Sequence, residues 1–495
     1  MKRVIFIISF LLLLVPQAAW AQSFDDYRAN ARKRFESYRM KKVSEFEAYR
    51  QKKNAEMEDY IRHAWRNMPG NNPEPVPVRE DRDVPPVVMP EEDRGKKPQD
   101  TPVPVKDVIP PAPPQPEPKP FAPVEESPIK SPAVELVFYG TSCSVRFDAA
   151  SAPKLGGVKE NAVADMWKAL CDEKYINFYR DCMDIRSRLS LCDWAYVGLS
   201  GAIANKVYGS ADEAVVLQTA VLIQSGYRIL LTRDKSGSLH NLIATDVDVF
   251  NRPYWTIDGV KYYLFDGTTP ESLFVMSKTA PELKPVRLSI TAENAFSESG
   301  SQPRTLKSQD YPDVVALVST NRNLISFYDG YPESFANNDP YTKWRFYAMA
   351  PLSASARKGL YQALKEAIAG KSEPDAAGML LNFVQTAFVY EYDNKVWGRD
   401  RAFFADETLY YPYCDCEDRS ILFSRLVRDL MGLDVVLVFC PGHLYTAVKF
   451  NESVSGDYLT IDGSKYVVCD PTYIHAPVGK TMPGMDNSTA VAIKL

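Results

Sequence analysis

The chain has 495 residues, of which 45% are hydrophobic, and its formal net charge is −5. This length accommodates two to four domains with buried cores. A charge this small on so long a chain excludes a strongly basic nucleic-acid-binding protein, and no nucleic-acid partner is expected.

Residues 1–21 have the pattern of a secretory signal peptide. Lys2 and Arg3 form a short basic region, an apolar run "VIFIISFLLLLVP" follows, and the small residues of "AAWA" end at Ala21. Such a segment is cleaved on export, and the apolar run is short for a membrane span. We expect an exported protein, periplasmic or secreted, that begins at Gln22 after cleavage.

Residues 22–67 contain an eleven-residue repeat. A phenylalanine or methionine recurs at the same position, with a tyrosine three residues later: Phe24, Phe35, Phe46 and Met57, then Tyr27, Tyr38, Tyr49 and Tyr60. Eleven residues make three turns at about 3.67 residues per turn, close to a straight helix. The pattern predicts an amphipathic, coiled-coil-like helix with an aromatic stripe. The stripe either packs on its own chain or a second copy of it, or docks on an envelope partner.

Residues 68–133 hold more than half of the 37 prolines in the chain. Such a composition cannot bury a core and favours an extended polyproline-type chain. We expect a disordered linker that holds the helix away from the folded body.

The rest of the chain carries a diverged duplication. Trp255–Asp266 matches Leu459–Asp470 at seven of twelve positions, and "SADEAVVL" from Ser210 aligns with "CEDRSILF" from Cys416. Each copy predicts helices, then a central helix ended by a glycine, then antiparallel strands, which is an α+β fold. The expected units are a first domain at 134–267, a mostly β connector at 268–323 and a second domain at 324–495.

The second copy places three reactive residue types in a suggestive order. Cys416 opens the central helix, where unpaired N–H groups and the helix dipole favour a thiolate. His443 follows on a strand, and Asp470 ends a later one. A cysteine, a base and an orienting carboxylate are what a cysteine nucleophile needs. The alternative is a buried cysteine beside a core histidine with satisfied hydrogen bonds.

No metal site or cofactor is expected. Cys414 and Cys416 are separated by a single residue, which is tighter than the usual spacing of zinc ligands, and a single histidine lies nearby. The eight cysteines of an exported chain allow disulfides, but the sequence fixes no pairing.

These motifs resemble those of the transglutaminase-like cysteine hydrolase superfamily, whose nucleophile opens the central helix in a G-x-C-x-D-type motif. Histidine and then aspartate, in D-P-T, follow on later strands. Here "YCDCEDRS", "PGHLYTAV" and "CDPTY" match in that order within about Ala376–Tyr473, and exported bacterial members with "DCED" are especially similar. The resemblance implies two tandem transglutaminase-like (papain-like) domains and a catalytic triad of Cys416, His443 and Asp470. Cys414 stands where glycine is common.

The resemblance also assigns roles around the triad. Asp418 falls at the position of a structural acid near the helix start. A second oxyanion donor would come from the aromatic residues before the helix, for which Tyr411, Tyr413 and Trp397 are candidates, with plain packing as their alternative role. In the first copy the equivalents are Ser210, His240 and Asp266, so that copy is expected to be degenerate and non-catalytic.

The implied function is acyl transfer on peptide-type amides of a peptide or protein substrate, through a thioester on Cys416. Hydrolysis (a peptidase or isopeptidase) and amine transfer (a transglutaminase) share this mechanism. The alternative is a non-catalytic cell-envelope binding or assembly protein, in which both domains are scaffolds and the segment at 22–67 binds the partner.

Overall fold

The computed structural model describes residues 17–77, 85–111, 119–123, 125–209, 211–278, 280 and 282–495, with side chains inside the first helix from residue 28 onward. Of the predicted signal peptide, residues 1–16 lie outside this part, and residues 17–21 begin helix α1 (Gln17–Arg62). Within the described ranges, every helix is too short or too polar to cross a membrane.

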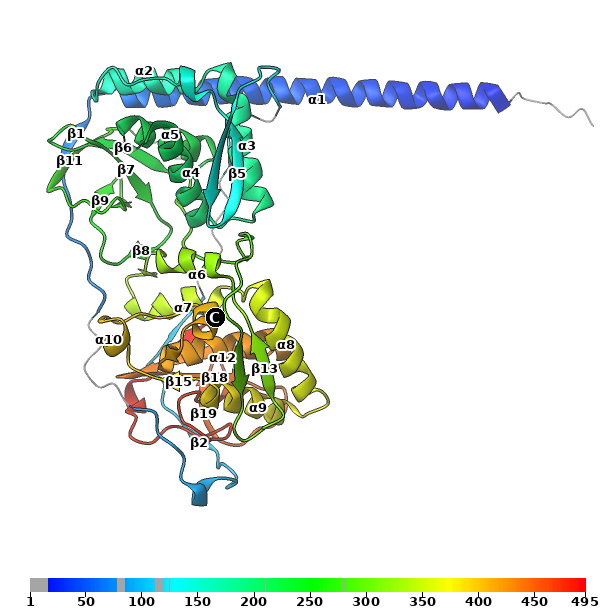
Figure 1. Cartoon of the computed structure of the whole chain (residues 1–495), viewed down its shortest axis with the longest axis vertical. Helices are drawn as coiled ribbons and strands as arrows, with labels where there is room; N and C mark the ends of the chain where they lie inside the picture. Colours follow the sequence, from blue (N-terminus) through cyan, green and yellow to red (C-terminus); the bar gives the residue numbers. More distant parts are fainter. Residues whose placement is uncertain are drawn as a thin grey trace, which may run out of the picture.

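The first half of the body places helices on an antiparallel sheet, as the helix-then-sheet pattern predicts (Figure 1). Its helices are α2 (Glu160–Leu170), α3 (Ile176–Arg188), α4 (Asp193–Tyr208) and α5 (Asp212–Gln224), preceded by the hairpin β4 (Ala133–Phe138) and β5 (Thr141–Arg146). Its sheet contains β6 (Ile229–Arg233), β7 (Leu239–Ala244), β9 (Tyr254–Ile257), β10 (Val260–Leu264) and β11 (Ser272–Val275). Helix α5 is the predicted central helix and packs on β6 and β7.

The second half repeats this plan. Its hairpin is β12 (Arg304–Lys307) and β13 (Val315–Val318), and its helices are α6 (Arg322–Asp329), α7 (Lys343–Met349), α8 (Ala354–Ile368), α9 (Glu373–Thr386), α10 (Asp393–Val396), α11 (Ala405–Tyr410) and α12 (Cys416–Met431). Its main sheet contains β17 (Asp434–Cys440), β18 (His443–Lys449), β19 (Asp457–Ile461), β20 (Ser464–Cys469) and β21 (Val491–Lys494). The short strands β15 (Val389–Tyr390) and β16 (Tyr413–Cys414) pair beside α12, and β14 (Ser334–Phe335) pairs with β8 (Asp248–Val249) of the first half.

The two sheets have the same strand order. The first runs β11-β6-β7-β10-β9 and the second β21-β17-β18-β20-β19, and all of these neighbours are antiparallel. Each central helix is followed by a glycine with positive φ, at 92° for Gly226 and 68° for Gly432, a conformation that glycine adopts without strain. The molecule is therefore a mixed α/β protein whose halves share one arrangement of strands.

The linker prediction is wrong for the described parts of residues 68–133. Strands β2 (Thr101–Pro102) and β3 (Asp107–Ile109) pair with the two outer strands of the second sheet, β19 and β21. An edge strand has unpaired N–H and C=O groups that an extended chain can satisfy, and proline is tolerated there. The proline-rich segment therefore covers sheet edges instead of separating the helix from the body.

The helix prediction also needs a correction at its C-terminal end. Helix α1 ends at Arg62, and β1 (Arg66–Pro69) pairs with β11 in the first sheet. Met57, Ile61 and Trp65 are buried in the core of the first half. Only the N-terminal part of α1 extends beyond the body (Figure 1), because the last repeats find an apolar surface on the same chain.

The expected connector at 268–323 is not a separate β unit. Strand β11 lies in the first sheet, and Val286, Leu288 and Phe296 are buried in the first core. The hairpin β12–β13 packs on α8, with Leu306 and Val318 in the second core. The segment divides between the two halves because its apolar residues follow two different hydrophobic surfaces.

Candidate functional site

The start of helix α12 is fixed by Asp418, as expected of a structural acid. One carboxylate oxygen of Asp418 accepts the Asp415 N–H (3.1 Å) and the other accepts the Phe403 N–H (2.9 Å). The side chain is fully buried, and burial, followed by the charge of Asp393, raises its pKa well above the usual range. Cys416, the first residue of the helix, is held at the end where backbone N–H groups favour a thiolate.

His443 and Asp470 form a buried pair at one end of the second sheet. The chain turns tightly from β17 into β18 through Pro441 and Gly442, whose φ of 78° suits this turn, so His443 is the first residue of β18. Asp470 directly follows β20, the neighbour of β18. His443 Nε2 lies 2.9 Å from Asp470 Oδ2.

The other oxygen of Asp470 is held by the backbone. Oδ1 accepts the N–H of Thr472 (2.8 Å) and that of Tyr473 (3.3 Å), and the Gln385 side-chain amide donates to the Asp470 carbonyl (3.0 Å). The carboxylate therefore has a fixed orientation, with Oδ2 directed at the imidazole. This is the arrangement that selects one tautomer of a histidine.

Helix α12 brings Cys416 to the same end of the sheet. Ser420, one turn after Cys416, donates its hydroxyl to the Leu444 carbonyl (2.8 Å), which directly follows His443. Because residues four apart share a helix face, Cys416 and Ser420 face β18 together. His443 Nδ1 is buried without a hydrogen-bond partner. Cys416, His443 and Asp470 are 1%, 0% and 1% exposed, so all three are closed to solvent, and His443 and Asp470 are in direct contact.

Glu417 is a neighbour that the sequence reasoning did not single out, although it belongs to the "DCED" motif. The Cys416 thiol donates to Glu417 Oε2 (3.1 Å), and Glu417 is fully buried. Its carboxylate also lies with those of Asp393 and Asp400, with ligand atoms within 4.8 Å of one another; Asp415, Cys416 and Glu417 form a second such group. These groups offer carboxylate oxygens and a sulfur to a cation.

Two of these carboxylates already contact positive or donating groups. Asp400 accepts the Lys343 ammonium (2.6 Å), and Asp393 accepts the Arg401 backbone N–H (2.6 Å). The absence of a metal stays a prediction.

The second thiol of the motif has a different environment. Cys414 lies on β16 with its sulfur 3.8 Å from the Val389 carbonyl, and burial raises its pKa to about 11. Burial raises the pKa of Cys440 to about 12 and also that of Cys469. All eight cysteines lie in the described ranges, and none forms a disulfide.

Of the three aromatic candidates for an oxyanion donor, two pack on the same arginine and the third is exposed. Trp397 and Tyr411 enclose the Arg401 guanidinium, which lies 4.5 and 5.3 Å from their ring centres. Arg401 forms an ion pair with Glu407 (2.6 Å), whose pKa burial raises to about 7. Tyr413 lies on β16 with 41% of its surface exposed. Packing around Arg401 accounts for Trp397 and Tyr411.

The first half keeps two of the three expected equivalents. Ser210 lies outside the described residues. His240 Nδ1 lies 2.6 Å from Asp266 Oδ2, and Asp266 Oδ1 accepts the Thr268 N–H (2.9 Å), as Asp470 does from Thr472. On the other side of the ring, Asp234 Oδ2 lies 3.5 Å from His240 Nε2.

Comparison of the chain with family models, with curated proteins and with solved structures found no match.

Proposed function

We propose that this protein is an exported, transglutaminase-like cysteine enzyme that transfers acyl groups of peptide-type amides through Cys416. The observation that carries the proposal is the buried His443–Asp470 pair, whose second imidazole nitrogen has no hydrogen-bond partner. The bond between Ser420 and the Leu444 carbonyl brings the helix that starts at Cys416 against the same strand.

In the proposed reaction His443 is the base and Cys416 is the nucleophile. His443 Nδ1 takes the thiol proton, and the Cys416 sulfur attacks the amide carbonyl. The imidazolium returns the proton to the leaving amine, and a thioester remains on Cys416. Asp470 stabilises the imidazolium and holds its orientation. The Cys416 N–H at the helix start is placed to stabilise the oxyanion. Water or an amine then releases the acyl group.

In this proposal the two halves are tandem transglutaminase-like domains of which only the second is catalytic. Support comes from the shared strand order and from the His–Asp pairs at matching positions. The proposed substrate class, a peptide or protein, rests on the resemblance of the motifs around Cys416, His443 and Asp470 to the transglutaminase-like superfamily.

A second candidate function is a non-catalytic envelope binding or assembly protein built on these scaffolds. The observation in its favour is that the three site residues are at most 1% exposed, so a substrate reaches Cys416 only after the site opens.

Alkylation of the thiols separates the two functions. Iodoacetamide near neutral pH, followed by peptide mass spectrometry, should modify Cys416 faster than the other seven cysteines, because it alone opens a helix beside a histidine. His443→Ala should slow that reaction, and Cys414→Ala is the matched control that should not. Equal, slow modification of Cys416 and Cys469 would support the binding function.

A further inference from the structure

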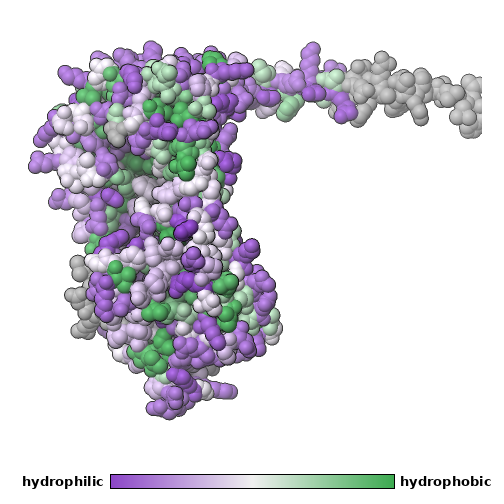
Figure 2. Space-filling view, viewed as in Figure 1, coloured by the Kyte–Doolittle hydropathy of each residue, from purple (hydrophilic) through white to green (hydrophobic). Residues whose placement is uncertain are grey.

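Helix α1 has two parts of opposite charge. Residues 28–44 carry seven basic side chains and Glu36 as their single acid: Arg28, Arg32, Lys33, Arg34, Arg39, Lys41 and Lys42. Residues 45–59 carry five acids, Glu45, Glu47, Glu56, Glu58 and Asp59, against three bases. The basic part projects from the body, and the acidic part lies along the first half (Figures 1 and 2).

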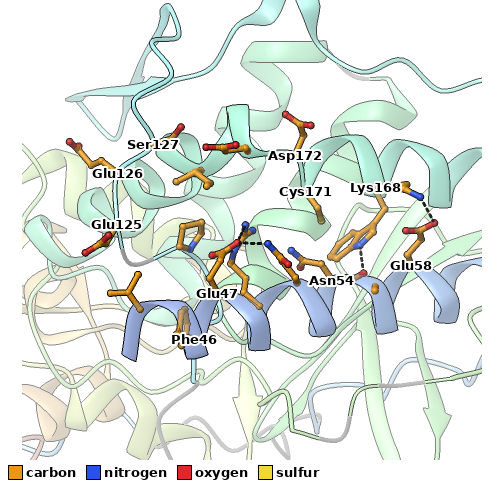
Figure 3. Close-up of a pocket in the computed structure, with 18 of the residues that line it drawn as sticks. Phe46, Glu47, Asn54, Glu58, Glu125, Glu126, Ser127, Lys168, Cys171 and Asp172 are labelled. Atoms are coloured by element: carbon orange, nitrogen blue, oxygen red, sulfur yellow. Dashed lines mark hydrogen bonds and ion pairs between the residues drawn. The ribbon is translucent and has the colours of Figure 1, made fainter. Parts of the chain in front are cut away.

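The acidic part of α1 borders a hollow of about 620 Å³ (Figure 3). Its apolar lining includes Phe46, Trp167 and Ile176. Six carboxylates line it, against the two bases Arg50 and Lys168: Glu47, Glu58, Glu125, Glu126, Asp172 and Glu173. Arg50 is buried and already paired with Glu47 (2.6 Å). The hollow is thus an apolar groove with an acidic rim.

A second hollow, of about 700 Å³, continues this groove along the helix. Val43, Phe46 and Glu125 line both hollows, and Phe35 and Tyr38 line the second. Phe35, Tyr38 and Met40 are 65%, 61% and 60% exposed. Exposed aromatic side chains on a projecting helix are an unfavourable surface in water unless a partner covers them.

The face that docks in the acidic part continues into the basic part. The residues that face the first half are spaced by four, four and three positions: Phe46, Arg50, Asn54, Met57, Ile61 and Trp65. The same spacing toward the N-terminus gives Val43, Arg39, Phe35, Arg32 and Arg28. The projecting part therefore presents an aromatic and arginine-rich version of the face that already packs on this fold.

We propose that two copies of this chain associate through α1 in antiparallel fashion, each placing its basic part against the acidic groove of the other. A two-fold axis near Ser44 aligns residues 28–43 of one copy with residues 45–60 of its partner. Phe35 then lies over the groove between α1 and α2, and Arg32 approaches Glu56. Such an interface is self-complementary, as a two-fold dimer requires, and its charges also select the antiparallel direction.

Charge exchange tests this arrangement directly. The chain from Gln22 onward, the product that the signal-peptide prediction gives, is measured by analytical ultracentrifugation at low and high salt. One variant is Arg32→Glu with Lys33→Glu, and the other is Glu126→Lys with Glu173→Lys. The four positions are exposed. The changes leave the Arg39–Glu125 ion pair (2.7 Å) intact and remove two ion pairs within one chain, Arg32–Glu36 (3.3 Å) and Arg146–Glu126 (3.0 Å).

The wild type should be a dimer that weakens at high salt, and each variant alone should dissociate at least tenfold more readily. An equimolar mixture of the variants should restore the dimer, because each mixed pair contains two complementary contacts. A Phe35→Ser variant should also weaken the dimer. A monomeric wild type, or variants that dimerise like the wild type, would overturn the proposal, and so would a mixture that stays monomeric. If α1 instead binds a partner of another kind, such as an anionic membrane, the wild type alone should be monomeric.

Discussion

The His–Asp pairs of the two halves have the same frame and opposite ring orientations. In both, the aspartate accepts a backbone N–H two residues later and contacts the histidine of the neighbouring strand. His240 presents Nδ1 to Asp266, and the Asp234 carboxylate lies 3.5 Å from its buried Nε2 as an ion-pair partner without a hydrogen bond. His443 presents Nε2 to Asp470, and its buried Nδ1 likewise has no hydrogen-bond partner. The two sites therefore differ in the second carboxylate beside His240.

This difference separates a structural histidine from one suited to catalysis. Burial lowers the pKa of His240, but the hydrogen bond and charge of Asp266, and then those of Asp234, outweigh it, so its pKa is raised above 6.5. Two carboxylates beside one imidazole favour its protonated form, which cannot accept a further proton. A histidine with one oriented carboxylate and one available nitrogen can accept a thiol proton. The fold is thus shared, and the second carboxylate distinguishes the two sites.

The largest expected effect is the loss of activity on replacing His443. His443→Ala should lower hydrolysis or transfer of a peptide-type amide by roughly 1,000-fold or more, because the residues of one catalytic unit fail together. Cys416→Ala should lose a similar factor, and Cys414→Ala should retain a substantial part. His240→Ala is the matched control in the first half and should leave the rate within about threefold. A similar loss in the two histidine variants would abolish the distinction between the halves.

Glu417 should lower the reactivity of the Cys416 thiol, which has a serine, Ser210, as its equivalent in the first half. Because the Cys416 thiol donates to its buried carboxylate, a negative charge there opposes thiolate formation. Glu417→Gln should therefore speed alkylation of Cys416 by about tenfold at pH 7, the effect of lowering the thiol pKa by about one unit, or roughly 1.4 kcal/mol. Glu417→Asp keeps the charge and serves as the control. An unchanged rate in the glutamine variant would show that this contact does not restrain the thiol.

Both sheets use the N-terminal segment as an edge strand, β1 in the first and β3 in the second. Ile109 on β3 is 5% exposed, and the Arg345 guanidinium donates to its carbonyl (3.3 Å). Ile109→Asp should destabilise the second half by about 2–4 kcal/mol, because a charge replaces a buried side chain. Thermal unfolding measures this loss. Val108→Asp, at the half-buried neighbouring position, should cost clearly less.

The smallest expected effect is a pH dependence confined to the first half. The raised pKa of His240 stabilises the fold below pH 6.5, and this contribution is lost as the pH rises through the folded value. The lowered pKa of Asp266, from its bonds to His240 and Thr268 against the opposing effect of burial, contributes above pH 3.8. His240→Gln should lower the melting temperature by about 2–4 °C at pH 5.5 and by less at pH 8.5. An equal decrease at both pH values would contradict the ion-pair account.

The repeated parts of the fold were predictable from local signals. The matching "TIDG-KY" hairpins, the glycines after the central helices and the two histidines mark equivalent strands, and the structure gives both halves the same strand order. The positions of His443 and Asp470 in the sequence likewise predicted that they meet, because the start of β18 and the end of β20 lie at one end of the sheet, where the two side chains are in contact.

The other features of the fold and the site could not be predicted, because they depend on surfaces that exist only in the folded protein. Proline content predicts an extended chain, and β2 and β3 are extended, but which sheet edges need covering is a property of the folded body. The predicted linker would have held the last helical repeats away from the body, yet Ile61 and Trp65 are buried against it. The contact between Glu417 and the Cys416 thiol depends on the direction of the glutamate side chain. Aromatic residues before α12 pack on the Arg401 guanidinium, and the sequence does not show where that group lies.

The most direct test of the central claim is to detect an acyl-enzyme. The protein is incubated with a mixture of peptides, quenched in acid and analysed by peptide mass spectrometry with and without hydroxylamine, which cleaves thioesters. We expect an acyl adduct on Cys416 that hydroxylamine removes, that is absent from Cys416→Ala, and that has no counterpart in the first half. An adduct on another residue, or none on Cys416 while an amide substrate is consumed, would contradict acyl transfer by the second half.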